Sequence, residues 1–140
     1  DEIPVEHRED GSKIVVIAGK TRNGTSGVIN NTFVHPTYWD VSLSGGSQLL
    51  EIIDESHNVF VYMIEGKTEV GEQKQNLSRG QLGVLSKASE VKISSKEKSR
   101  FLIIGGKPLN EPVERAGPFV MNTRQEINQA FSDYRSGQFA

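Results

Sequence analysis

The stretch Tyr38-Trp39-Asp40-Val41-Ser42-Leu43 carries an apolar side chain at every second position from Trp39 onward. This alternation is typical of a β-strand that buries one of its two faces. The stretch Glu90-Val91-Lys92-Ile93-Ser94 repeats the same pattern. By contrast, Val59-Phe60-Val61-Tyr62-Met63-Ile64 is apolar on both faces, which predicts a strand in the middle of its sheet. No long helical period separates these segments, and the pattern therefore favours an all-β fold over an α/β fold.

Short apolar runs of this kind recur about every ten residues between Ser12 and Gly106, with turn-forming and charged residues between them. Such spacing predicts a β-sandwich or a β-barrel. The expected strands are Lys13–Ala18, Asn31–His35, Tyr38–Ser44, Gln48–Ile53, Val59–Ile64, Lys67–Val70, Gln81–Leu85, Glu90–Ser94 and Arg100–Ile104.

The C-terminal segment has the features of a short amphipathic helix. Thr123 and Glu126 match the Thr-x-x-Glu capping box, which satisfies two backbone N–H groups at a helix start. Gly137 supplies a C-terminal stop. The apolar stripe at helical spacing consists of Ile127, Ala130, Phe131 and Tyr134. We therefore expect a helix at about residues 123–136.

The composition restricts the classes of function. The formal net charge of −2 is spread along 140 residues, so no field is available to attract nucleic acid or an anionic membrane. The absence of cysteine excludes disulfides, thiolate metal sites and a cysteine nucleophile. No run approaches the roughly 20 apolar residues that span a bilayer. We expect a cytoplasmic protein, or a nuclear one in a eukaryote.

The chain is expected to form one domain at residues 13–140, preceded by a polar leader at residues 1–12 that serves as a linker or an edge segment. It starts at Asp1 without a methionine, and we interpret it as a fragment of a longer protein.

Several short motifs occur in a characteristic order. They include Trp39-Asp40-Val41, His57-Asn58-x-Phe60-Val61-Tyr62, and Gly105-Gly106-Lys107-Pro108-Leu109 followed by Glu111-Pro112. The tail from Gly117-Pro118-Phe119 to Tyr134-Arg135-Ser136-Gly137 completes the set. Together they resemble the C-terminal domain of the pirin family, which consists of iron-binding two-domain cupins. The resemblance implies a cupin-type jelly roll, also called a double-stranded β-helix, with a short C-terminal helix.

The first cupin motif is similar to Gly-x5-His-x-His-x4-Glu-x6-Gly, and Gly46 and Gly66 have the separation of its two glycines. The second motif resembles Pro-x-Gly-x2-His, and Ser78-Arg79-Gly80 stands at its turn. The ligand positions of the two motifs then fall on Ile52, Asp54, Val59 and Gly83. The resemblance therefore implies degenerate ligand positions and no cofactor in this chain. It places iron, or another divalent metal, in an N-terminal cupin that lies outside the chain.

The three histidines do not suggest a metal site of another kind. A cupin iron or nickel site needs three imidazoles and usually a carboxylate that converge inside the barrel. His7 lies in the polar leader, His35 precedes Pro36, and His57 lies in the turn Asp54-Glu55-Ser56-His57-Asn58. We interpret them as turn and surface residues. The alternative is an adventitious site that combines His57 with Asp54 or Glu55.

Three hypotheses for the function follow. In the first, the chain is the non-catalytic half of a pirin-like protein. The family resemblance associates such proteins with quercetin 2,3-dioxygenase activity or with redox-responsive regulation of transcription factors or metabolic enzymes. In the second, it is a free-standing cupin that binds a small apolar ligand or a protein partner. In the third, it catalyses dioxygenase chemistry alone, which conflicts with the empty ligand positions because no bound metal would activate oxygen.

The first hypothesis needs a surface that contacts the N-terminal cupin, or that leads to self-association when this domain is absent. A short helix must bury its apolar stripe on its own domain or on a neighbour. The candidates are Phe119, Met121, Ile127, Phe131 and Tyr134. For the pair Phe119 and Met121, core packing under the tail is the favoured alternative.

Overall fold

The computed structural model describes residues 2–31 and 33–137. The chain divides into two compact units, a β unit at Asp1–Pro108 and a C-terminal unit at Leu109–Ala140. Among the described residues, all the regular elements are strands except the helix of the C-terminal unit, which confirms the all-β prediction.

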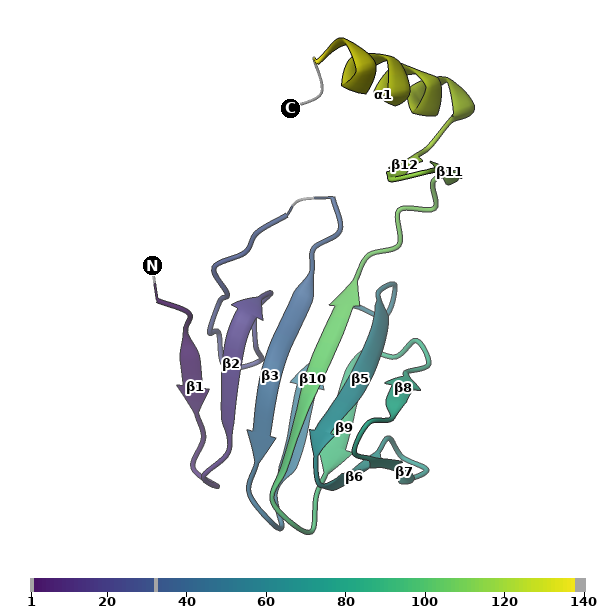
Figure 1. The fold of residues 1–140 in the computed structure, drawn as a ribbon. Coiled ribbons are helices and arrows are strands. Elements are labelled where there is room, and N and C mark those ends of the chain that lie inside the picture. Colours follow the sequence, from purple (N-terminus) through teal and green to yellow (C-terminus); the bar gives the residue numbers. More distant parts are fainter. Residues whose placement is uncertain (1, 32, 138–140) are drawn as a thin grey trace. The chain divides into compact units, whose positions relative to one another are not determined.

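The β unit consists of two antiparallel sheets that pack around one core (Figure 1). The large sheet has the order β1-β2-β3-β10-β5-β8, and the small sheet has the order β4-β9-β6-β7. The strands are β1 (Val5–His7), β2 (Lys13–Ala18), β3 (Thr37–Leu43), β4 (Gln48–Ile52), β5 (Asn58–Glu65), β6 (Lys67–Val70), β7 (Gln75–Ser78), β8 (Leu82–Val84), β9 (Glu90–Ser94) and β10 (Ser99–Gly106).

Alternation along the strands builds the core, as the sequence predicts. On β3, Trp39, Val41 and Leu43 are buried while the residues between them are only half-buried. Strand β5 pairs with β10 on one side and with β8 on the other, so it lies inside the sheet as expected from its apolar run. Val91 and Ile93 of β9 supply the facing side of the core. The two inner faces interdigitate as in other β-sandwiches.

The expected strand at Asn31–His35 is wrong. In the described part of this segment, the Asn31 side-chain oxygen accepts hydrogen bonds from the backbone N–H groups of Phe33 and Val34, at 2.9 and 3.1 Å. His35 donates its N–H to the Asn31 carbonyl oxygen and has a positive φ of 44°. Asparagine competes with a sheet ladder for backbone groups in this way, and the segment therefore forms a turn.

Within the β unit, two short strands lie outside the nine expected strands. Strand β1 falls within the polar leader and pairs with β2 at the edge of the large sheet. Strand β7 pairs with β6 across the turn at Gly71. Both strands are short and mostly polar, so they lack the alternation of apolar and polar residues from which a strand is predicted.

The C-terminal unit consists of a hairpin and a helix. Strands β11 (Glu114–Ala116) and β12 (Phe119–Met121) pair across Gly117-Pro118, and helix α1 (Arg124–Ser136) follows. The predicted capping box is present: Thr123 Oγ1 accepts the Glu126 N–H at 3.2 Å, and Glu126 Oε2 accepts the Thr123 N–H at 3.0 Å. Gly137 ends the helix in the left-handed conformation, as expected.

Candidate functional site

The four positions that the cupin motifs mark as degenerate ligands do not share one face. On β4 and the residue after it, Leu49, Glu51 and Ile53 are buried. Because side chains alternate along a strand, Ile52 and Asp54 point the other way, and both are exposed. Val59 is part of the core, whereas Gly83 pairs with Val61 and lies against the Leu77 side chain. The inner face of β4 therefore carries Glu51 and Ile53, one residue before the positions that the motif marks.

Large side chains occupy the space between the two sheets. Trp39, Leu43, Met63 and Phe101 are each no more than 1% exposed. Within residues 2–31 and 33–137, no group of three or more His, Asp or Glu side chains has an arrangement that could hold a metal ion. The adventitious site of His57 with Asp54 or Glu55 accordingly lacks a third ligand among these residues.

A buried ionic cluster joins the edges of the two sheets. The Glu51 side chain on β4 is 0% exposed and accepts a hydrogen bond from Arg8 Nη2. The same guanidinium contacts Glu6 on β1, with Nε 2.9 Å from Glu6 Oε1. Glu51 also accepts the Arg22 backbone N–H at 2.7 Å, and the Thr21 hydroxyl donates to Glu6. The cluster thus fixes the loop after β2 to both sheet edges.

The electrostatics of this cluster follow from its contacts. Burial raises the pKa of Glu6, but hydrogen bonds from Thr21, Thr25 and Arg8 outweigh it and hold that pKa below the ordinary value of 4.5. Burial likewise lowers the pKa of Arg8, and its bonds to Glu51 and Glu6 more than compensate, so the net shift is upward. Sequence analysis missed this cluster. Its one signal is Glu51, a carboxylate among the apolar inward positions of a strand.

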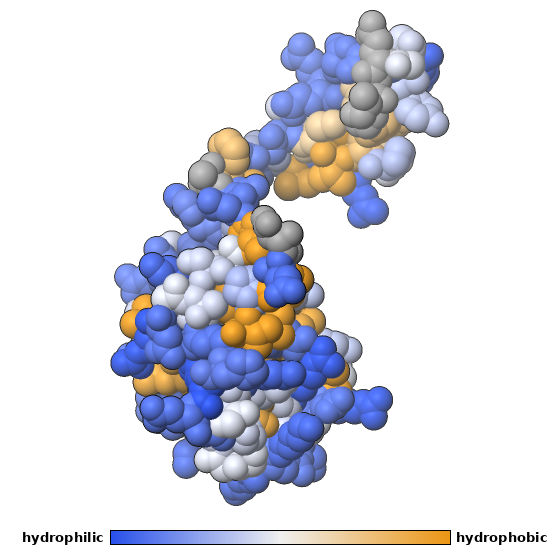
Figure 2. Space-filling view, turned by 90° about the vertical axis from the view of Figure 1, so that its left-hand side faces the viewer, coloured by the Kyte–Doolittle hydropathy of each residue, from blue (hydrophilic) through white to orange (hydrophobic). Residues whose placement is uncertain are grey.

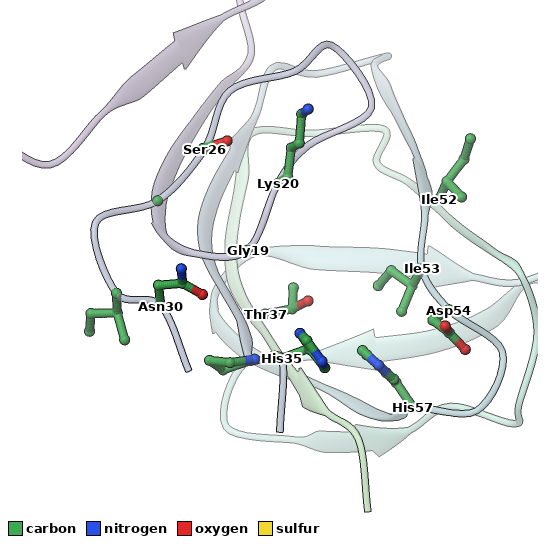
Figure 3. Close-up of a pocket in the computed structure, with 13 residues that line it drawn as sticks. Gly19, Lys20, Ser26, Asn30, His35, Thr37, Ile52, Ile53, Asp54 and His57 are labelled. Atoms are coloured by element: carbon green, nitrogen blue, oxygen red, sulfur yellow. The ribbon is translucent and has the colours of Figure 1, made fainter. Parts of the chain in front are cut away.

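A pocket of about 400 Å³ opens where β2 and β4 end and β3 and β5 begin. Figure 3 shows the imidazoles of His35 and His57 beside Thr37 and Ile53 in this pocket. The Nδ1 atom of His57 is buried and has no hydrogen-bond partner within the described residues. The pocket thus combines a few polar groups with an aliphatic wall.

The loop after β2 and the turn before β5 form the walls of this pocket, which is also lined by Gly19, Lys20, Ser26, Gly27, Ile29, Asn30, Pro36, Ile52 and Asp54. The hydroxyl and backbone N–H of Ser56 donate to Asp54, at 2.6 and 2.8 Å, and hold the pKa of this carboxyl below its usual value. Of the four degenerate ligand positions, Ile52 and Asp54 line this pocket, whereas Val59 and Gly83 do not.

The outward side of the large sheet is unusually apolar. In one cross-strand row, Tyr38 pairs with Ile104, Ile104 with Phe60, and Phe60 with Val84. In the next row, Leu102 pairs with Tyr62 and Tyr62 with Leu82. These seven residues are called the outer apolar face below. Tyr62, Leu82 and Val84 are 41%, 56% and 78% exposed, and the other four are half-buried.

The second row continues to the opposite edge of the sheet, because Leu102 also pairs with Asp40, Asp40 with Val15, and Val15 with Val5. Figure 2 views the side of the molecule that carries β1 and shows apolar surface there within largely hydrophilic surroundings. Ile3 and Val5 are 47% and 44% exposed.

The suggested interface residues of the C-terminal unit lie mostly within its small core. Phe119 and Ile127 are buried with Ala130, and Met121 and Phe131 pack against them. The rings of Phe119 and Phe131 meet edge to face at a centroid distance of 5.0 Å. Tyr134 is 69% exposed, although its ring lies 6.4 Å from that of Phe119. Over the described part of the chain, no helix is long and apolar enough to cross a bilayer.

Comparison with known proteins relates this fold to one family. Residues 38–140 match the model of the pirin C-terminal cupin domain. A pirin-like protein of Caulobacter vibrioides is 36% identical over 99% of the chain, and human pirin is 35% identical over 99%. The crystal structure of a quercetin 2,3-dioxygenase from Acinetobacter baumannii superposes with a TM-score of 0.82 at 35% identity and covers 99% of the chain.

The chain spans about half the length of these proteins: 50% of the Caulobacter protein, 48% of human pirin and 48% of the Acinetobacter structure. More distant structural matches show the same fold, including an RmlC-like cupin from Shewanella frigidimarina with a TM-score of 0.54 at 10% identity. These matches confirm the cupin fold and the family resemblance expected from the sequence. The chain belongs to the pirin family and contains its C-terminal cupin domain.

Proposed function

We propose that this chain is the metal-free C-terminal half of a pirin-like two-domain cupin, which packs on an N-terminal cupin and shapes its iron site. The whole protein would act as a quercetin 2,3-dioxygenase or as a redox-responsive regulator of transcription. The name of the Acinetobacter relative supports the first of these activities. The half-length coverage of the relatives supports the division into two domains.

The chemistry of the inward positions carries the proposal. Redox-active iron in cupins needs imidazole and carboxylate ligands that converge on one point. On the inner face of β4 the chain has Glu51, whose carboxylate is already bonded to Arg8, and the aliphatic Ile53. Val59 and Gly83 add no donor atom from their side chains. This half therefore offers packing and shape rather than metal ligation.

Metal content tests the proposal. The 140-residue chain and the protein at its natural length would each be incubated with Fe(II) or Ni(II), desalted and measured by mass spectrometry. The chain should retain less than about 0.1 equivalent, because it lacks a converging ligand set. The longer protein should retain about one equivalent, as expected for one cupin site. Near-stoichiometric metal in the chain alone would contradict the proposal.

A second candidate function is the binding of a small, largely apolar molecule in the pocket of Figure 3. Its volume lies within the usual range of ligand pockets, roughly 300–1,000 Å³, and such pockets combine apolar walls with few polar groups. Benzyl alcohol and benzoate would serve as probes in amide chemical-shift titrations. Shifts around Ile53 and His57 that His57→Ala weakens would support this function, with His7→Ala on β1 as the matched control.

A further inference from the structure

The outer apolar face carries more apolar side chains than a sheet face in contact with solvent normally does. An antiparallel sheet with one solvated side normally alternates apolar inward and polar outward residues. Strand β5 instead places Phe60 and Tyr62 outward, and its neighbour β8 places Leu82 and Val84 on the same side. Contiguous apolar surface of this kind marks an interaction site on a folded protein.

Charged residues border this face on one side. In the next row, Lys13 pairs with Ser42, Ser42 with Arg100, and Arg100 with Glu65. Asp40, the one carboxylate in the second row, is held by Arg100 through two hydrogen bonds of 3.0 and 2.6 Å. An apolar centre with a mixed-charge rim is the usual anatomy of a protein–protein interface. A rim with both signs of charge does not favour an anionic membrane.

The shape of the face indicates the occupant. The first row crosses four neighbouring strands, which corresponds to roughly 15 Å at the usual strand separation of about 4.8 Å. A face of this width, formed by neighbouring strands of one sheet, is complementary to another sheet, since sheets stack face to face. The match to this chain covers about half of each relative, so each relative has a second region of about the same length.

We infer that the outer apolar face is the docking surface for the second domain of the natural-length protein, the half that its relatives carry and this chain does not include. This inference rests on the proposed function, and it assigns the contact to a defined surface: Tyr38, Phe60, Tyr62, Leu82, Val84, Leu102 and Ile104. Val84 lies at the outer edge of the interface, and Phe60 and Ile104 lie nearer its centre.

Cysteine labelling tests the inference, because the chain contains no cysteine of its own. Val84→Cys and Leu82→Cys would be made both in the 140-residue chain and in the protein at its natural length. Glu72→Cys, at an exposed position between β6 and β7 of the small sheet, is the matched control. Maleimide addition at each position would be followed by peptide mass spectrometry, which distinguishes these sites from cysteines elsewhere in the longer protein.

Labelling at Val84→Cys and Leu82→Cys should slow at least about tenfold in the longer protein, since an interface must open before a buried thiol reacts. The rate at Glu72→Cys should be equal in both proteins. Equal rates at all three positions would overturn the inference. If the same sample of the longer protein holds iron, such a result leaves the proposed function standing. A longer protein without a second domain or iron would defeat both.

Self-association is the remaining outcome. Protection that grows with the concentration of the isolated chain, and is missing from the natural-length protein, would assign the face to a second copy and overturn the inference. Light scattering on the same samples reads the oligomeric state directly.

Discussion

The substitution Arg8→Met tests whether the buried ionic cluster holds the two sheet edges together. Methionine keeps most of the apolar length of arginine and removes its charge. Glu51, at 0% exposure, would then keep only the Arg22 backbone N–H among the partners described above. Glu6 would keep its bonds from Thr21 and Asn23. The main consequence of the substitution is thus a buried carboxylate without a counter-charge.

The expected effect is large because removal of one partner leaves the other charge desolvated. Breaking a buried ion pair in this way destabilises a protein by about 3–5 kcal/mol. For a unit of this size, at about 4 °C per kcal/mol, that corresponds to a fall in Tm of roughly 12–20 °C. Replacing both partners, as in Arg8→Met with Glu51→Leu, should restore stability to within about 1–2 kcal/mol of the native chain, because the uncompensated charge is gone.

Urea unfolding followed by tryptophan fluorescence measures these changes, because Trp39 is the only tryptophan and is 1% exposed in the core of the β unit. Arg100→Met is the matched control: it removes the partly exposed pair with Asp40 and should lower stability by less than about 1 kcal/mol. A loss at Arg8→Met no larger than at Arg100→Met, or a double variant as unstable as the single one, would refute the reasoning.

Three further predictions concern single positions. The pKa of Glu6 is lowered, so its ionised carboxylate stabilises the fold above about pH 4.5, and this stabilisation is lost as the pH falls through the folded-state pKa. Glu6→Gln should therefore flatten the fall of the urea midpoint between about pH 5 and pH 3. An unchanged slope would exclude this role of Glu6. Gly27→Ala should destabilise by about 1–3 kcal/mol in thermal unfolding, because a Cβ there would lie 2.5 Å from the Ile17 carbonyl oxygen. Thr123→Ala should remove about 1 kcal/mol of capping energy, seen as faster hydrogen exchange in α1 with no change in the Trp39 transition.

The sequence predicts those parts of the fold that local periodicity determines. Strand β3 follows from the alternation at Trp39, Val41 and Leu43, and β5 from its apolar run. Helix α1 follows from the Thr123–Glu126 capping box and from Gly137, since caps are interactions among residues three to four apart. In each case the information lies within one short segment.

The parts that sequence reasoning missed depend on long-range pairing. Arg8 and Glu51 are 43 residues apart, and neither residue reveals the other. Side chains along β4 alternate between the two faces of the sheet. An error of one residue in aligning the cupin motif therefore moves Ile52 from the inner to the outer face. The apolar run of β5 predicted a central strand, but it could not show that β8 and β10 extend the same apolar surface across the sheet.

The small core of the C-terminal unit has a thermodynamic consequence. Among its described residues, 109–137, only Phe119, Ile127 and Ala130 are buried. Chains below about 40 residues rarely fold stably without a staple or a partner. The free energy of local unfolding of the C-terminal unit is therefore expected to be low. Amide hydrogen exchange should measure this free energy separately from that of the β unit. Any surface that binds the folded hairpin and helix must first supply the free energy that orders them. This linkage weakens the contact while making it sensitive to small changes within the unit, such as the loss of a single cap.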